Sequence, residues 1–124
     1  MKFLLLVHHN ESEFSKLDDL VKRDMLAESV RLTHTLESAK LYLNASPLVP
    51  SQSAAKVQVR NGKRSVTDGP FVETHEQIAG YFMVEAKDLN EAISISEKVP
   101  GARIGTVEVR QIFEIEGLPK GLHV

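Results

Sequence analysis

Two short segments of the chain are apolar at every position. FLLLV occupies residues 3–7 and YFMV occupies residues 81–84. A strand with one face in water alternates apolar and polar side chains, whereas an unbroken apolar run is typical of a strand covered on both faces. We therefore expect two central strands of one sheet at these positions, with something packed against each face of the sheet.

A long amphipathic helix is expected after the first of these strands. Ser15 can cap its first turn, and the helical pattern continues to about Lys40. The apolar residues that recur at helical spacing are Leu17, Leu20, Val21, Met25, Leu32 and Leu36. These residues predict the helix face that packs on the sheet.

A second helix is expected over KDLNEAISISEKV, directly after the second apolar strand. Asp88 is the predicted N-cap and Glu91, three residues later, completes a capping box. Pro100 and Gly101 end the helical pattern. The side expected to face the sheet carries Leu89, Ala92, Ile93 and Ser96.

The remaining strand patterns complete one fold class. LYLNASPLV predicts a strand at a sheet edge or a bulge, because Pro47 lacks an N–H for the ladder, and IGTVEVRQIF alternates as a final strand. Between them, AKVQVRNGKRSVTD alternates around Asn61-Gly62, the usual sequence of a two-residue type I′ hairpin. The order strand, helix, strand, hairpin, strand, helix, strand predicts an α+β fold: a ferredoxin-like split βαβ sheet with an inserted β-hairpin and both helices on one face.

The uncovered face of such a sheet predicts a partner. Since the central strands are apolar on both sides, a second copy of the chain is the most economical cover, so we expect a homodimer whose sheets face each other. The length of 124 residues fits a single domain, which we place at residues 1–113, with residues 114–124 as a C-terminal tail.

Composition and charge exclude several classes of function. The formal charge of −2 gives no reason to expect direct binding to nucleic acid. The chain has no cysteine, which excludes disulfides and thiol nucleophiles, and its histidines lack metal-binding spacing, so no metal is expected. The run FLLLV is too short to span a bilayer. A cytoplasmic protein that does not bind membranes is the expectation, and no cofactor can be named.

Several motifs also carry a family resemblance over nearly the whole chain. TDGPFVET, EQIAGYF, DLNEA and GTVEVR, with the opening MKFLLLVHH, resemble the DGPF domain of the YCII-related proteins. The resemblance implies a dimeric α+β barrel, and the activity of that family is largely undefined. YCII-like proteins have been suspected of His-Asp chemistry, and DGPF proteins often accompany extracytoplasmic-function sigma factors. The family's first helix normally stops at alanine-glycine, where this chain has Ala39-Lys40.

The stretch SVTDGPFVETHEQIAGYF holds the first group of candidate site residues. Asp68 ends a hairpin strand beside Gly69-Pro70, and it is either the acceptor of an Asx turn or a carboxylate aimed into a pocket. Glu73 and His75 lie two residues apart and share a side in an extended chain, so the carboxylate can hold the imidazole as a base. Solvated surface side chains are the alternative for both.

The second group lies on the expected sheet and helix. His8 ends the first strand on the side of Leu4 and Leu6, whereas His9 points the other way, so one of the two approaches the sheet interior. A histidine that only bonds to a backbone carbonyl at the strand end is the alternative to a functional role. Glu28 falls on the apolar face of the long helix, where its carboxylate either is buried and needs a partner or reaches the rim of that face and stays in water. Arg110 and the Tyr81 hydroxyl are the partners expected for it.

Two functions from different classes fit these residues. The first is an enzyme that uses acid-base chemistry on a small polar metabolite, with Asp68, His8 and His75 as catalytic residues and Glu28, Glu73, Tyr81 and Arg110 as ligand-binding residues. The second is a non-enzymatic small-molecule-binding or regulatory accessory protein, to which the resemblance adds a link with sigma-factor-dependent transcription. The ligand is not identified by the sequence.

Overall fold

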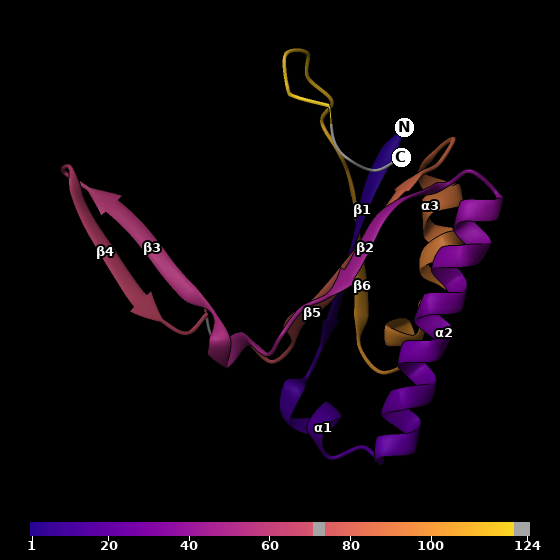
Figure 1. Ribbon diagram of the computed structural model, residues 1–124, viewed down its shortest axis with the longest axis horizontal. Helices are drawn as coiled ribbons and strands as arrows, with labels where there is room; N and C mark the ends of the chain where they lie inside the picture. Colours follow the sequence, from indigo (N-terminus) through magenta and orange to yellow (C-terminus); the bar gives the residue numbers. More distant parts are fainter. Residues whose placement is uncertain (71–73, 121–124) are drawn as a thin grey trace.

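The computed structural model describes residues 1–70 and 74–120. Four strands form an antiparallel sheet in the order β2-β5-β1-β6, with bounds Tyr42–Pro47, Gln77–Glu85, Lys2–His9 and Thr106–Gln111. The helices α2 (Asp19–Ser38) and α3 (Leu89–Ser96) lie on one side of this sheet (Figure 1). The predicted α+β class with a split βαβ sheet is therefore confirmed.

The core lies between the sheet and the two helices. In β1, Phe3, Leu5 and Val7 are buried, while the side chains between them are only partly covered. The central strand β5 adds Phe82 and Val84 to the same layer. The helices contribute Leu32, Leu36, Ala92 and Ile95. Burying one such large side chain stabilises the fold by about 1.5 to 3 kcal/mol, so this layer holds the helices on the sheet.

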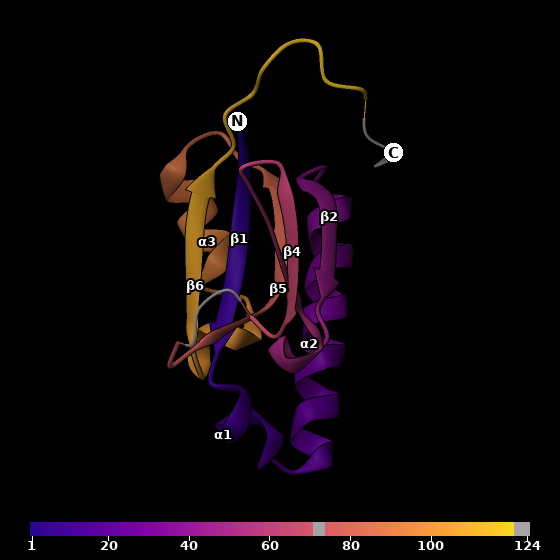
Figure 2. The same cartoon turned by 90° about the vertical axis from the view of Figure 1, so that its left-hand side faces the viewer.

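The opposite face of the sheet carries no helix. Leu4 and Leu6 alternate with the buried residues of β1, and Met83 and Tyr81 are their neighbours in β5. These four residues, which we call the open face, are partly exposed in the single chain. Figure 2 looks at the sheet from the side away from the helices.

The first helical region starts differently from the prediction. A short helix, α1 (Glu11–Ser15), is capped by the Asn10 side chain, which accepts from the Glu13 N–H at 2.8 Å. The long helix α2 then starts anew, with Asp18 accepting from the Leu20 N–H at 2.9 Å. The prediction of Ser15 as the cap was wrong because each helix found a nearer Asn or Asp cap, which are among the strongest cap residues.

Helix α2 ends in a left-handed residue that is not glycine. Lys40 has a φ of 63°. The Lys40 N–H donates to the Glu37 carbonyl at 3.0 Å and the Leu41 N–H donates to the Leu36 carbonyl at 2.8 Å. This pair of bonds is a Schellman motif, and Leu41 packs against the core as that motif requires. The stop expected near Ala39-Lys40 is thus confirmed, with lysine in the position that usually holds glycine.

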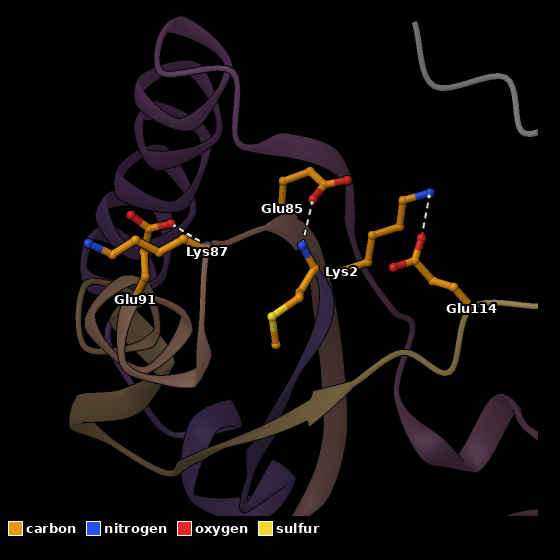
Figure 3. Close-up of polar contacts among 6 residues, drawn as sticks. Lys2, Glu85, Lys87, Glu91 and Glu114 are labelled. Atoms are coloured by element: carbon orange, nitrogen blue, oxygen red, sulfur yellow. Dashed lines mark hydrogen bonds and ion pairs between the residues drawn. The ribbon is translucent and has the colours of Figure 1, made fainter.

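Helix α3 begins as predicted and buries a shifted face. The Asp88 carboxylate accepts from the Glu91 N–H at 2.9 Å, so the predicted N-cap is confirmed. The Glu91 carboxylate accepts from the Lys87 N–H at 2.9 Å, one residue before the Asp88 N–H that a capping box uses (Figure 3). The buried residues are Ala92, Ile95 and Ser96. Leu89 and Ile93, expected on this face, are 51% and 40% exposed, because α3 is only eight residues long and rests on the sheet along a short part of its surface.

Two ion pairs join the start of the chain to the end of β5 and to the segment that follows β6. The terminal ammonium of Met1 lies 3.3 Å from Glu85, and Lys2 Nζ lies 3.7 Å from Glu114 (Figure 3). Both pairs are exposed, so each contributes at most about 1 kcal/mol. Backbone bonding from the Ile112 N–H to the Lys2 carbonyl at 2.8 Å continues the contact beyond β6.

The inserted hairpin forms as predicted and stands away from the sheet. Strands β3 (Ala55–Arg60) and β4 (Lys63–Asp68) pair with each other as a separate two-stranded sheet. Asn61 and Gly62 have φ of 52° and 73°, the two positive values that a type I′ turn requires. We call β3 and β4 the arm, and it projects on the side of the sheet away from the helices (Figure 1).

Candidate functional site

A cleft of about 610 Å³ lies between α2 and the sheet. Its walls come from α2, from β2 and the segment after it, from the first half of β5 and from the segment around η2 (Pro100–Arg103). Most of the lining is apolar and includes Met25, Leu26, Val30, Leu48 and Ile104. Clefts of about 300 to 1,000 Å³ hold small molecules in proteins, so this one is the first candidate for a binding site.

The cleft exists because only half of α2 rests on the core. In its C-terminal half, Leu32 and Leu36 are 7% and 4% exposed. In its N-terminal half, Leu20, Leu26 and Val21 are 62%, 55% and 45% exposed. Figure 1 shows this N-terminal half reaching past the sheet towards α1. Of the apolar residues that predicted the packed helix face, Leu32 and Leu36 are in the core, whereas Met25 lines the cleft and Leu20 and Val21 are exposed.

Two ionisable residues stand at the end of the cleft where β1 meets α1. His9 follows Phe3, Leu5 and Val7 in the alternation of β1 and points to the same, helix-covered side. Its imidazole stacks on the ring of Phe14, with 4.4 Å between the ring centroids and 15° between the planes. Glu11 also lines the cleft. Further polar side chains on the lining come from α2 and are Lys22, Ser29 and Thr33.

Burial sets the charge state of His9. Desolvation lowers the pKa of its imidazole below the usual 6.5, and the nearby carboxylates of Glu11 and Glu76 offset only part of that effect. The neutral imidazole is therefore favoured near pH 7, and one of its nitrogens can accept a proton or a hydrogen bond.

Glu11 fastens this corner to the segment that follows β2. Its carboxylate accepts from the Ser51 N–H at 2.8 Å and from the Ser51 hydroxyl at 3.1 Å. Its own N–H donates to the Gln77 side-chain oxygen at 2.9 Å. The Asn10 side-chain amide donates to the His75 carbonyl at 2.9 Å. Three segments distant in sequence are therefore held together around the polar end of the cleft.

Glu28 pairs with a residue that the sequence did not suggest. Both of its carboxylate oxygens accept from the Arg103 guanidinium, at 2.8 Å and 2.9 Å. These hydrogen bonds lower the pKa of the Glu28 carboxyl. The prediction of Arg110 or Tyr81 as the partner was wrong, because both point to the open face while Glu28 lies on the helix-covered side. The pair bridges α2 to η2 beside the cleft, whose lining includes Ile104.

His8, Arg110 and Tyr81 lie on the side of the open face. His8 Nε2 lies 3.3 Å from a Glu108 carboxylate oxygen, and the other oxygen of Glu108 lies 3.7 Å from Arg110 Nε. The Tyr81 hydroxyl donates to the Asn44 side-chain oxygen. The structure thus brings His8 and Arg110 together around one carboxylate, on the face of the sheet opposite to the cleft.

Asp68 and His75 lie apart from both groups. Asp68 is exposed at the end of β4, opposite Ala55, and among the described residues its carboxylate makes no hydrogen bond or ion pair to a histidine. The side chain of His75 is exposed, although its carbonyl holds Asn10. Glu73 lies outside the described residues. The predicted candidates are therefore spread over the arm, the open face and the flank of α2.

Sequence reasoning did not select His9 and Glu11. The alternation of β1 had placed His9 opposite to His8, and that was the available signal: the buried series Phe3, Leu5, Val7 continues to His9. No comparable signal existed for Glu11, because its role depends on Ser51, 40 residues away.

Two further properties hold for the part of the chain that the structure describes. No three or more His, Cys, Asp or Glu side chains gather there in a way that could hold a metal ion. None of the helices seen in residues 1–70 and 74–120 combines the length and apolar character that crossing a membrane requires.

Known proteins are similar to this one over almost the whole length of the chain. The family model of the YCII-related domain matches residues 1–116. An uncharacterized protein of Rhizobium meliloti is 32% identical over 118 residues, which cover 90% of this chain and 92% of that protein. The residues matched by the family model include every strand and helix described above.

Proposed function

The chain belongs to the YCII-related family, and we propose that it is a small-molecule-binding protein whose site is the cleft between α2 and the sheet. The cleft itself carries this proposal: it has the volume of a ligand site, an apolar lining, and two ionisable groups at one end. Its walls come from the end of β1, from α1, α2, β2 and β5, and from the segment around η2, which are distant from one another in sequence.

The lining indicates the chemistry of the ligand. Leu26, Val30 and Leu48 offer apolar surface, so most of the ligand is apolar. The half-buried His9 offers one hydrogen-bonding group. The Glu11 carboxylate already accepts two hydrogen bonds from Ser51. A compact, largely apolar molecule with one polar end suits this arrangement.

A homodimer is the assembly that goes with this site. Leu4, Leu6 and Met83 form an apolar centre on the sheet face that no helix covers, and their exposure in a single chain supports a second copy as cover. Two sheets packed in this way make the dimeric α+β barrel to which the DGPF resemblance leads. The absence of cysteine fits a cytoplasmic location, which is part of this proposal.

A fluorescent probe tests the cleft directly. We expect anilinonaphthalene sulfonate, which is apolar with one polar end, to bind saturably with one site per chain. Ser29 lines the cleft, so Ser29→Phe fills it and weakens binding by about tenfold or more. Ser94→Phe makes the same change on the exposed side of α3 and leaves binding unaltered. Equal binding by both variants would place the probe elsewhere and overturn the proposal.

An enzyme that uses acid-base chemistry is the second candidate. The observation that favours it is the lowered pKa of His9, since a neutral imidazole in a half-buried cleft can act as a base. In this version Asp68 works with a histidine, as the sequence suggests. Removal of that charge by Asp68→Asn would then move the titration of at least one histidine to lower pH by NMR. Five unchanged histidine titrations would remove Asp68 from the site.

A regulatory accessory role is one version of the first proposal: the protein binds a small molecule and catalyses no reaction, and the bound state regulates a partner protein. The resemblance to DGPF proteins that accompany sigma factors supports it, and a partner protein would then respond to the occupied cleft. Co-purification with a sigma factor that depends on ligand occupancy is the expected result, and co-purification that ignores the Ser29→Phe change would count against it.

A further inference from the structure

The arm has an apolar face that nothing in a single chain covers. Val57, Val59 and Val66 are 65%, 61% and 46% exposed. Every residue of β4 is exposed, and in β3 only Lys56 is partly covered. A two-stranded hairpin is marginally stable by itself in water, so an ordered arm needs a surface to pack on.

The pairing of β3 with β4 determines which side chains of the arm share a face. Val57 stands opposite Val66, and Val59 stands opposite Arg64. Because side chains alternate along a strand, Ala55 joins these residues on one face. Lys56, Gln58 and Arg60 fall on the other face, together with their partners Thr67, Ser65 and Lys63. The arm is therefore amphipathic: one face, the valine face, has Val57, Val59 and Val66 with Arg64 and Asp68 near its two ends, and the other face is polar throughout.

The position of the arm brings it to the side where a second copy would sit. Figures 1 and 2 show it leaving the sheet on the side of the open face, away from the helices. Six residues per strand at about 3.3 Å each give an arm of about 20 Å. Packed sheets lie about 10 Å apart, so an arm of this length reaches well beyond the first layer of a facing copy.

The charge of the arm is opposite to that of the rest of the molecule. Residues 55–68 contain four basic residues, Lys56, Arg60, Lys63 and Arg64, and one acidic residue, Asp68, so the arm is basic. The whole chain carries a formal charge of −2, so the remainder is acidic. A copy of this chain therefore presents a surface that attracts the arm, whereas two arms repel each other.

We propose that the arm is an exchange arm: in the dimer, the valine face of each arm packs on the body of the partner subunit. The proposal rests on the dimer put forward under Proposed function. The arm then belongs to the interface and is ordered by the contact that also covers the open face.

The base of the arm extends this inference to the cleft. The segment that joins β2 to β3 contains Leu48, Val49 and Pro50, which line the cleft, and Ser51, which is bound by Glu11. A partner that holds the arm therefore also holds one wall of the cleft. We expect the affinity of the cleft for anilinonaphthalene sulfonate to fall when the arm loses its partner.

The test compares substitutions on the two faces of one strand. Val59→Asp places a charge on the valine face. Gln58→Asp places the same charge on the neighbouring residue, which lies on the polar face. Both sites are exposed in the single chain, so neither change disturbs the core. By sedimentation equilibrium we expect Val59→Asp to raise the dimer dissociation constant by about tenfold or more, and Gln58→Asp to change it by less than about threefold.

Amide hydrogen exchange in the parent protein separates the possible results. We expect the amides of β3 and β4 to be protected above the dissociation constant and to exchange freely below it. If the protein is a dimer but the amides of the arm stay unprotected, and if Val59→Asp and Gln58→Asp have equal effects, the proposed arm contact is wrong and the proposed dimer is retained. Protection that persists in the monomer means that the arm packs on its own chain and also overturns the proposal. A parent that remains monomeric at high concentration refutes the dimer itself, and the arm with it.

Discussion

Lys40 offers a substitution that should stabilise the protein, although it removes a side chain. Its φ of 63° lies in the left-handed region, which costs an L-residue about 1 to 2 kcal/mol. Glycine avoids that cost but gives the unfolded chain more freedom, which costs about 0.5 to 1 kcal/mol. The two backbone bonds at the helix end do not involve the side chain and remain. Lys40→Gly should therefore raise the free energy of unfolding by about 0.5 to 1 kcal/mol.

The assay is equilibrium unfolding in urea at one fixed protein concentration, with a thermal melt beside it. The expected gain corresponds to a rise in Tm of about 2 to 5 °C for a domain of this size. Lys40→Ala is the matched control: it removes the same charge and stem but keeps a Cβ, so its stability should stay within about 0.5 kcal/mol of the parent. If Lys40→Gly is no more stable than Lys40→Ala, the left-handed stop of α2 is not strained and the reasoning fails.

Three further predictions concern glycine positions and pH. Gly69 has a φ of +95°, and a Cβ added there would meet no atom within 4 Å, so Gly69→Ala should cost about 1 kcal/mol from the backbone alone, as urea unfolding would measure; an unchanged midpoint would contradict this. A Cβ at Gly80 would lie 2.7 Å from the Ser46 carbonyl oxygen, a backbone atom of the neighbouring strand, so Gly80→Ala should destabilise by about 1 to 3 kcal/mol and displace the cleft wall; full stability with unaltered probe binding would refute it. Because burial lowers the pKa of His9, the unfolded chain takes up a proton there at higher pH than the folded chain, so stability is complete above the usual pKa of 6.5 and falls as the pH drops below it. In His9→Gln, the free energy of unfolding measured in urea should depend less on pH between about pH 7.5 and pH 5. A pH dependence identical to that of the parent would exclude His9 as the cause of the loss of stability.

Local patterns in the sequence were sufficient for most of the fold. The strand predicted from the apolar run at residues 3–7, the Asn61-Gly62 turn and the Asp88 cap each follow from patterns within a few residues, and all three are confirmed. The predicted cap at Ser15 was wrong for a local reason, since Ser15 is the last residue of α1, which Asn10 caps, and Asp18 caps α2.

The candidate site was harder to predict because its contacts are long-range. The helical spacing of Leu20 and Val21 shows that these residues need cover, but the pattern does not say whether a sheet, a ligand or another chain provides it. Glu28 was expected to need a partner and has one, yet Arg103 is 75 residues away and nothing in the local sequence points to it. His9 was placed on the correct side by alternation alone, and only the tertiary fold shows that this side opens into a cleft.

The central claim is that the cleft beneath α2 binds a small molecule, and amide chemical shifts measured during a titration test it most directly. With anilinonaphthalene sulfonate added to isotope-labelled protein, the largest shift changes should fall on cleft residues such as Thr33, Gly80 and Gly101, and the His9 ring signals should move with them. The same titration of Ser29→Phe should leave those residues unmoved. Changes confined to Leu4, Leu6 and Met83 on the open face, with the cleft residues unaffected, would contradict the account.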